Sequence, residues 1–417
     1  MPAPPSAPTD FISTLRQVWW RLDAKLDAEM LYWSAALGAA EALMSGTTSI
    51  IDHHESPNFI EGSLDVIAQA CADIGVRVNT CFGATDRWTD NGTLVDSVSP
   101  HSSMTSAARR ALDECDRFLN NGGRGMVGLH ASFTCSDETL EAATEMAKKH
   151  SVGVHIHVAE GIDDAGAGQR LEPIASDDWL LVHCVLLDRQ LKGRIVHNPR
   201  SNMNNSVGYA APSRRTNTTL LGTDGIGSDM LEEFRLAYAR LREFDIKENP
   251  ATVWSWLENG YHYFPEARKD VVVWSYDAID DPWKLAFTTG VHPIEVIVDG
   301  KTVLKDGKPT TFDIEEVRTK ATEQAKRLAF IGSKESLESN KKLIEVNGSP
   351  SYQDFVEFHS NTHLHIKPGT HITFKGKNGG LIIYGAAHFE GTANNPIIIE
   401  AQNGHDASIF IESLMKT

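Results

Sequence analysis

Short apolar runs alternate with segments of helical periodicity from residue 47 to residue 224. Seven of the runs have the length and composition of buried strands: 47–54, 77–84, 125–133, 153–159, 179–185, 194–200 and 218–224. Helix-patterned segments, including 63–74, 105–120 and 137–150, lie between them. Because strands joined by crossover helices run parallel, this order predicts an α/β fold built of βαβ units.

An eighth strand, which would complete a (β/α)8 barrel, is not evident. Residues 9–46 read as helical, since Phe11, Leu15 and Leu22 recur at helical spacing. The connection 186–193 is also shorter than the roughly ten residues that a parallel crossover needs. The pattern therefore predicts a TIM-like barrel with one strand fewer than usual.

Titratable residues stand where several of the predicted strands end. One run carries His157 inside a strand and Glu160 at its end, and two later runs end in His183 and Asp224. Barrel enzymes place their reacting groups at the carboxyl ends of the strands. Because imidazole and carboxylate groups are ligands for divalent metals, this order predicts a mononuclear metal-dependent hydrolase.

The chain as a whole suggests three domains. Residues 1–265 carry the incomplete barrel, and 266–330 a partial β-sandwich with a last helix from about 314 to 329. In 331–417, short β runs are separated by Gly and Asn turns at intervals of roughly 15–20 residues, which is typical of a parallel β-solenoid. One interpretation of this tail is a carbohydrate- or surface-binding module.

Charge and cysteine usage restrict the partners. A net charge of −17 over 417 residues argues against nucleic acid or an anionic membrane as the main partner. No run is long and apolar enough to span a membrane, and the first residues lack the pattern of a secretion signal. The five cysteines are scattered without a CxxC pair, which favours a cytoplasmic protein. We expect a small-molecule substrate, and a homo-oligomer stays open.

Five motifs follow one another along the chain: Leu129-His-Ala-Ser-Phe133, Val154-His-Ile-His-Val-Ala-Glu160, Leu181-Val-His183, Val196-His-Asn-Pro-Arg-Ser-Asn-Met-Asn-Asn205 and Gly222-Thr-Asp-Gly225. In this order they resemble the amidohydrolase superfamily, and within it the aminohydrolase and chlorohydrolase branch that contains guanine and adenosine-type deaminases. The stretches Trp19–Asp23 and His197–Asn205 are most similar to SsnA-type aminohydrolases, which are linked to selenium metabolism. The resemblance covers about residues 8–330.

The resemblance implies an activity and the residues that perform it. It implies a TIM-like barrel that hydrolyses non-peptide C–N bonds, most plausibly by deaminating a heterocyclic amine. His157, His183 and Asp224 would hold one divalent metal ion, zinc or iron. Glu160, His183 and Asp224 would be catalytic: Glu160 would shuttle a proton to the substrate nitrogen, and Asp224 would take a proton from the attacking water.

The resemblance also implies a substrate-facing set, which consists of His130, Arg200 and Asn202. Superfamily members open with a His-x-His pair on the first barrel strand, which is the strand not found here. The alternative function is therefore a catalytically inactive fragment or fusion of this family with a binding or structural role. A His-x-His at His363 and His365 is better interpreted as the outer face of a solenoid strand.

Several other histidines are interpreted as structural residues and not as metal ligands. His155 shares a strand with His157, but the motif selects His157. His53 and His54 are adjacent on a strand, so at most one of them faces the barrel interior. His197 is interpreted as a brace for the loop that follows it.

Overall fold

The computed structural model describes two compact units of the chain, Met1–Leu328 and Ala329–Thr417. The described residues are 8–89, 92–279, 281–340, 342–352, 356–358, 362–375, 380–383, 386–401 and 408–411. The finer division into three domains stays a prediction.

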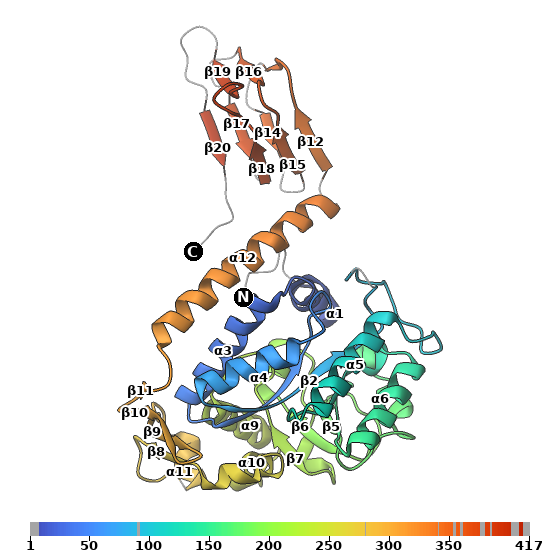
Figure 1. Ribbon diagram of the computed structural model, residues 1–417, viewed down its shortest axis with the longest axis vertical. Coiled ribbons are helices and arrows are strands. Elements are labelled where there is room, and N and C mark those ends of the chain that lie inside the picture. The colour runs from blue at the N-terminus through green and yellow to red at the C-terminus, as the bar shows by residue number, and fades with distance from the viewer. Residues whose placement is uncertain are drawn as a thin grey trace. The chain divides into compact units, whose positions relative to one another are not determined.

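The first unit is organised around a curled sheet of seven parallel strands in the order β1-β2-β3-β4-β5-β6-β7 (Figure 1). The strands are β1 Ser49–His54, β2 Arg77–Ala84, β3 Val127–Ala131, β4 Val154–Val158, β5 Leu180–His183, β6 Arg194–His197 and β7 Thr219–Leu221. All seven lie within the predicted runs, so the predicted strand count, direction and order are confirmed.

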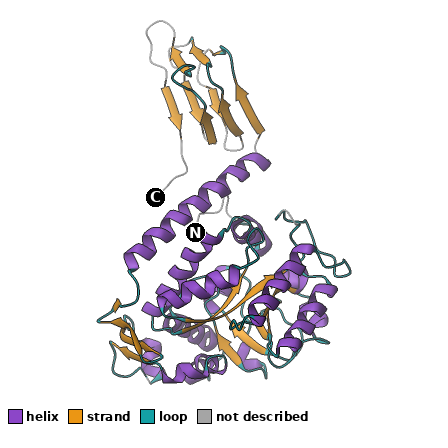
Figure 2. Cartoon of the chain, viewed as in Figure 1, coloured by secondary structure: helices purple, strands orange, loops and turns teal. Residues whose placement is uncertain are grey.

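Helices cover the outside of this sheet (Figure 2). The three long crossovers are α4 Ser63–Ile74, α5 Ser106–Asn120 and α6 Asp137–His150. Thr105 and Ser136 accept hydrogen bonds from the first turns of α5 and α6, which is why those helices begin there. The later crossovers contain little helix. The helix between β4 and β5, α7 Ala167–Leu171, is short, and no helix joins β5 to β6 among the described residues.

The core of this unit lies between the strands and these helices. Leu129, Ile156 and Leu181, from β3, β4 and β5, are fully buried, as is Trp179. Burying each such side chain contributes about 1.5–3 kcal/mol of hydrophobic free energy. The core therefore holds the strand ends, and with them the site, on a rigid frame.

Helical segments precede β1, as predicted. They are α1 Phe11–Thr14, a π-helical turn Leu15–Trp19, α2 Trp20–Asp23 and α3 Ala28–Met44. A Cβ added at Gly161, after β4, would lie 2.4 Å from the Phe11 ring, and one added at Gly225, after β7, would lie 3.6 Å from Trp19. This N-terminal segment therefore packs against the loops at the carboxyl ends of the strands.

The rest of the first unit follows β6. The elements are α8 Pro199–Asn204, α9 Met230–Phe244, α10 Pro250–Glu258, β8 Val271–Trp274, α11 Pro282–Phe287, β9 Pro293–Val298, β10 Lys301–Lys305 and β11 Lys308–Pro309. Strands β8 to β11 form a small antiparallel sheet, with Asp299 and Gly300 at positive φ in the predicted turn between β9 and β10. The final helix, α12 Ile314–Asn340, runs past the predicted end at about 329.

The described residues of the second unit form nine short strands in three parallel sheets, ordered β12-β15-β18, β13-β16-β19 and β14-β17-β20. The strands are β12 Lys342–Val346, β13 Ser351–Tyr352, β14 Val356–Phe358, β15 Thr362–Ile366, β16 His371–Phe374, β17 Gly380–Ile383, β18 Ala386–Phe389, β19 Ile398–Ala401 and β20 Ser408–Ile411. Every third strand stacks on the same sheet, which is the arrangement of a three-sided solenoid and confirms that prediction. Among the described residues of both units, no helix is long and apolar enough to cross a membrane.

Candidate active site

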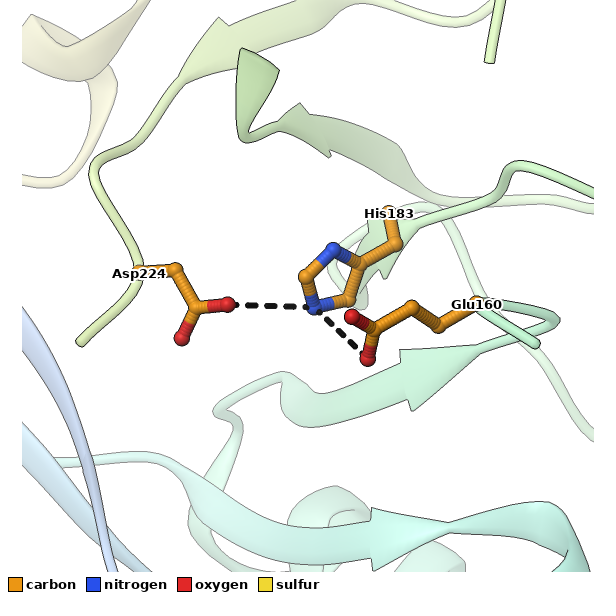
Figure 3. Close-up of side chains that lie close together, drawn as sticks. All are labelled: Glu160, His183 and Asp224. Atoms are coloured by element: carbon orange, nitrogen blue, oxygen red, sulfur yellow. Dashed lines mark ion pairs between the residues drawn. The ribbon is translucent and has the colours of Figure 1, made fainter. Parts of the chain in front are cut away.

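Three titratable side chains converge at the carboxyl end of the seven-stranded sheet. Glu160, His183 and Asp224 each offer a ligand atom, and these atoms lie within 4.8 Å of one another. Figure 3 shows the His183 ring between the two carboxylates. Its Nε2 atom lies 3.3 Å from Glu160 Oε2 and 3.7 Å from Asp224 Oδ2. The structure thus brings together the three residues predicted to be catalytic.

The strand ends explain this convergence. His183 is the last residue of β5, and Glu160 and Asp224 follow β4 and β7 by two and three residues. Parallel strands present their carboxyl ends at one edge, so side chains from distant parts of the sequence meet there. His183 (φ 70°) and Asp224 (φ 55°) also have left-handed backbones. Such conformations cost about 1–3 kcal/mol each and are common at active sites.

The two carboxyl groups differ in their electrostatic environment. Burial raises the pKa of Glu160, which outweighs the lowering effects of His183 and of the Asn205 amide. Burial also acts to raise the pKa of Asp224, but the charge of His183 and the hydrogen bond from Ser201 lower it below its ordinary value. Asp224 therefore stays a carboxylate, whereas Glu160 is biased towards holding a proton.

His157 lies beside this group, with its ring centroid 5.6 Å from that of His183. Its Nδ1 atom is 2.7 Å from the backbone carbonyl oxygen of His130, which can only accept, so Nδ1 carries the ring proton. Burial lowers the pKa of His157 to about 4. The ring is consequently neutral near pH 7, with the lone pair on Nε2 free to bind a metal.

The chemistry of this donor set fits a divalent cation. Nε2 of His183 lies within 3.7 Å of one oxygen from each of the two carboxyl groups, so one nitrogen and two oxygens point at the same small space. Imidazole nitrogen and carboxylate oxygen are common ligands of catalytic zinc. The donor atoms that lie within 4.8 Å of one another come from Glu160, His183 and Asp224, whereas His157 lies beside this set, so its predicted role as a ligand stays a prediction.

The residues predicted to face the substrate lie in different environments. His130 lines the cavity described below, and its Nδ1 is 2.7 Å from Thr134 Oγ1. Asn202 is 1% exposed, and its Oδ1 lies 2.8 Å from Nδ1 of His183. Arg200 donates to Glu233 at 2.6 Å and pairs with Glu232 at 2.9 Å. Neither Arg200 nor Asn202 is part of the cavity wall, so their contact with substrate stays a prediction.

A cavity of about 1160 Å³ includes the site and is also lined by residues of α3, β1 and α12. Aromatic side chains, including Trp19, Trp20 and Phe133, form part of its wall beside His130. The guanidinium of Arg87 stacks on Trp20, 4.7 Å from the ring centroid. An aromatic wall next to a polar centre suits a planar heterocycle with a reactive substituent.

Sequence reasoning missed some of the site's neighbours. His53 faces the interior, with its ring centroid 4.6 Å from that of His157, while the neighbouring His54 bonds Ser56. Both residues border the cavity, so the prediction that at most one of this pair faces the barrel interior stays a prediction. The supporting roles of Ser201 and Asn205 were also missed, although their i,i+4 spacing after a strand end could have indicated a shared helix face.

Comparison with protein families matches residues 8–258 to the model of the amidohydrolase family. The 5'-deoxyadenosine deaminase of Methanopyrus kandleri is 33% identical over 253 residues, which are 54% of each chain. The 5-methylthioadenosine/S-adenosylhomocysteine deaminase of Desulfitobacterium hafniense is 27% identical, with 74% of this chain and 78% of that protein aligned. The chain spans about half the length of the first of these relatives. The finer likeness to SsnA-type enzymes stays a prediction.

Solved structures share the fold at lower identity. A zinc-bound adenosine deaminase from Xanthomonas campestris superposes with a TM-score of 0.63 at 17% identity, over 78% of this chain and 81% of that one. The zinc complex of the atrazine chlorohydrolase TrzN from Arthrobacter aurescens superposes with a TM-score of 0.58 at 20% identity, over 76% and 82%. These likenesses support the TIM-like fold.

Proposed function

Because this chain belongs to the amidohydrolase family, we propose that it is a metal-dependent hydrolase of non-peptide C–N bonds that deaminates a heterocyclic amine. One observation carries the proposal: Glu160, His183 and Asp224 converge beside His157 at the carboxyl end of the parallel sheet. These are the groups that hydrolysis at an electrophilic ring carbon requires, namely a proton acceptor, a proton donor and imidazole ligands.

His157, His183 and Asp224 would hold one divalent ion, zinc or iron. Zinc is favoured because two solved structures with this fold contain it. When bound, such an ion lowers the pKa of a water molecule towards ~7 and so supplies a nucleophile near neutral pH.

The two carboxyl groups divide the proton transfers. Asp224, whose pKa is lowered, accepts the proton of the attacking water. Glu160, whose pKa burial raises, carries a proton to the leaving nitrogen. His183 lies within 3.7 Å of both and orients the reacting oxygen between them.

The substrate class follows from the cavity and the relatives. Trp19 and Phe133, which line the cavity, offer apolar ring surface to an aromatic substrate, whereas Trp20 is 4% exposed with Arg87 stacked on it. The relatives' names specify adenosine, 5'-deoxyadenosine, 5-methylthioadenosine and S-adenosylhomocysteine deaminases. We propose an adenine nucleoside or a similar small heterocyclic amine, acting in the cytoplasm, and a homo-oligomer is compatible with this role.

The test is ammonia release from these four nucleosides by the purified 417-residue chain after zinc loading. Glu160→Gln should keep its zinc and lose about 10²–10⁴-fold in kcat, because the proton carrier is gone. No turnover by a zinc-loaded wild type, or full turnover by the variant, would contradict the proposal.

The second candidate is a family member that binds without catalysis. It is favoured by the sheet, since β1 and β7 stand at its two ends and are not paired with each other among the described residues. In addition, the group of possible metal ligands whose atoms lie within 4.8 Å of one another, among the described residues, contains only one histidine, His183. Stoichiometric zinc with no turnover on any heterocyclic amine would favour this candidate.

A further inference from the structure

We propose that α8 and the residue after it act as a positioning clamp, in which Ser201, Asn202 and Asn205 each hold one of the three converging groups. The clamp consists of these three residues. Its catalytic consequence rests on the proposed function, but its geometry does not. None of the three is a catalytic residue, because each acts through a neighbour that does touch the reacting atoms.

The hydrogen bond between Asn202 and His183 sets the orientation of the imidazole. Oδ1 of Asn202 lies 2.8 Å from Nδ1 of His183, and both side chains are 1% exposed. An amide oxygen only accepts, so Nδ1 carries a proton whether the ring is neutral or charged. Nε2 is therefore the atom that faces Glu160 and Asp224.

Ser201 and Asn205 hold the two carboxylates. The Ser201 hydroxyl donates to Asp224 Oδ2 at 2.5 Å, which is the oxygen that faces His183. The Asn205 amide donates to Glu160 Oε1 at 3.1 Å and leaves Oε2 towards His183. Ser201 and Asn205 are also linked to each other at 3.4 Å, so the two carboxylates are coupled through one helix face.

An ion pair anchors the clamp to the rest of the fold. Arg200 donates to Glu233 Oε1 at 2.6 Å, and Glu233 is 1% exposed in the first turn of α9. The backbone amide of Asn202 donates to the carbonyl oxygen of Asn198, which follows β6 and is the N-cap residue of α8. Three groups from β4, β5 and β7 are thus fixed by a single anchored segment that follows β6.

The first test observes the His183 proton directly. In histidine-labelled protein, with the signal assigned by His183→Gln, we expect a slowly exchanging Nδ1–H resonance with or without zinc. It should persist in Asn202→Asp, which keeps an acceptor oxygen, and vanish in the nearly isosteric Asn202→Leu. A signal that survives in Asn202→Leu, or is lost in Asn202→Asp, would overturn the assignment.

The second test measures zinc dissociation constants by chelator competition. Ser201→Ala and Asn202→Leu should each weaken zinc about 10-fold or more, as is typical when the partner of a metal ligand is removed. Asn202→Asp, which keeps an acceptor oxygen, should leave the zinc affinity within about 3-fold of wild type, because the partner of His183 is then retained. Met203→Ala is the matched control, because Met203 is exposed on the same helix, and it should leave affinity unchanged.

The third test separates the clamp from the proposed function. Asn205→Leu should lower kcat about 10-fold with KM and zinc affinity nearly unchanged, because Glu160 moves protons and is not a predicted ligand. If the wild type releases no ammonia, the proposed function fails, and the first two tests still decide the clamp. Equal zinc affinities for wild type, Ser201→Ala and Asn202→Leu would refute the clamp even in an active enzyme.

Discussion

Nδ1 of His157 is held 2.7 Å from the backbone carbonyl oxygen of His130, on the adjacent strand. A carbonyl cannot donate, so this contact fixes the tautomer of His157 and leaves Nε2 unprotonated. His155, two residues earlier on the same strand, is 8% exposed, and its Nδ1 has no partner within the described residues. A backbone carbonyl therefore fixes the tautomer of His157, whereas no such contact in the described part of the chain fixes the tautomer of His155.

This difference predicts that only one of the two histidines is a metal ligand. His157→Gln should weaken zinc binding by at least ~100-fold, since it removes both the imidazole ligand and the hydrogen bond to the His130 carbonyl that orients it. His155→Gln, the matched variant on the same strand, should change affinity by no more than about 3-fold, below the roughly 10–100-fold loss that is typical when the partner of a metal ligand is removed. Chelator competition measures both, and equal losses would show that the strand motif does not select the ligand.

A second prediction concerns the anchor formed by Arg200 and Glu233. Arg200→Ala leaves the buried Glu233 without its partner and should cost about 2–3 kcal/mol in the free energy of unfolding, somewhat less than a fully buried pair because Arg200 is partly exposed. Adding Glu233→Gln should recover part of this loss. Urea unfolding provides the measurement.

The control for this anchor is Arg318→Ala, which removes an exposed ion pair with Glu315 inside α12. Exposed pairs contribute little, so this variant should change stability by less than about 0.5 kcal/mol. A similar loss in both variants would mean that the Arg200 pair is no more than a surface contact.

The third prediction is a pH dependence that comes from His197. This ring is fully buried between Tyr209 and Trp256, and neither nitrogen has a partner within the described part of the chain. Burial lowers the pKa of His197 from 6.5 to about 3, helped by the charges of His183 and Arg240. The contacts of its ring are therefore packing contacts, and the predicted role as a brace for the following loop stays a prediction.

The sign follows from the lowered pKa. Below pH 6.5, His197 binds a proton in the unfolded chain but stays neutral in the folded chain. The free energy of unfolding therefore decreases as the pH falls from 6.5 towards 3. His197→Leu removes this loss. The stability advantage of wild type over the variant should shrink by about 1.4 kcal/mol for each pH unit within the window. Above pH 7.5 the difference should be constant, and a difference constant at every pH would contradict the assignment.

The fourth prediction concerns the close approach of Gly83 and His53. A Cβ at Gly83 would lie 2.4 Å from Cε1 of His53, whose Nε2 is 3.0 Å from the carbonyl oxygen of Leu129. Gly83→Ala should therefore displace the ring and cost about 1–3 kcal/mol of stability. His53→Ala in the same chain should relieve the overlap. Gly38→Ala, where a Cβ meets nothing within 4 Å, is the control and should not destabilise.

Much of the fold could be predicted because its pattern is local. Each strand, such as β4 or β5, is a short apolar run bounded by polar turns, and each long crossover shows helical periodicity. The solenoid unit was also predictable, since its Gly and Asn turns recur at a regular interval. The end of α12 was placed too early, because helix boundaries depend on weak capping signals.

The amino-acid sequence by itself determined the parallel strand order and the placement of Glu160, His183 and Asp224 at strand ends, because both depend on local periodicity and chain order. Only the tertiary structure decided that Asn202 hydrogen-bonds to His183, whereas Arg200 forms an ion pair with Glu233. These contacts depend on the curvature of the sheet and the path of α8. Such long-range geometry places neighbouring residues of one motif in opposite surroundings, and no local pattern encodes it.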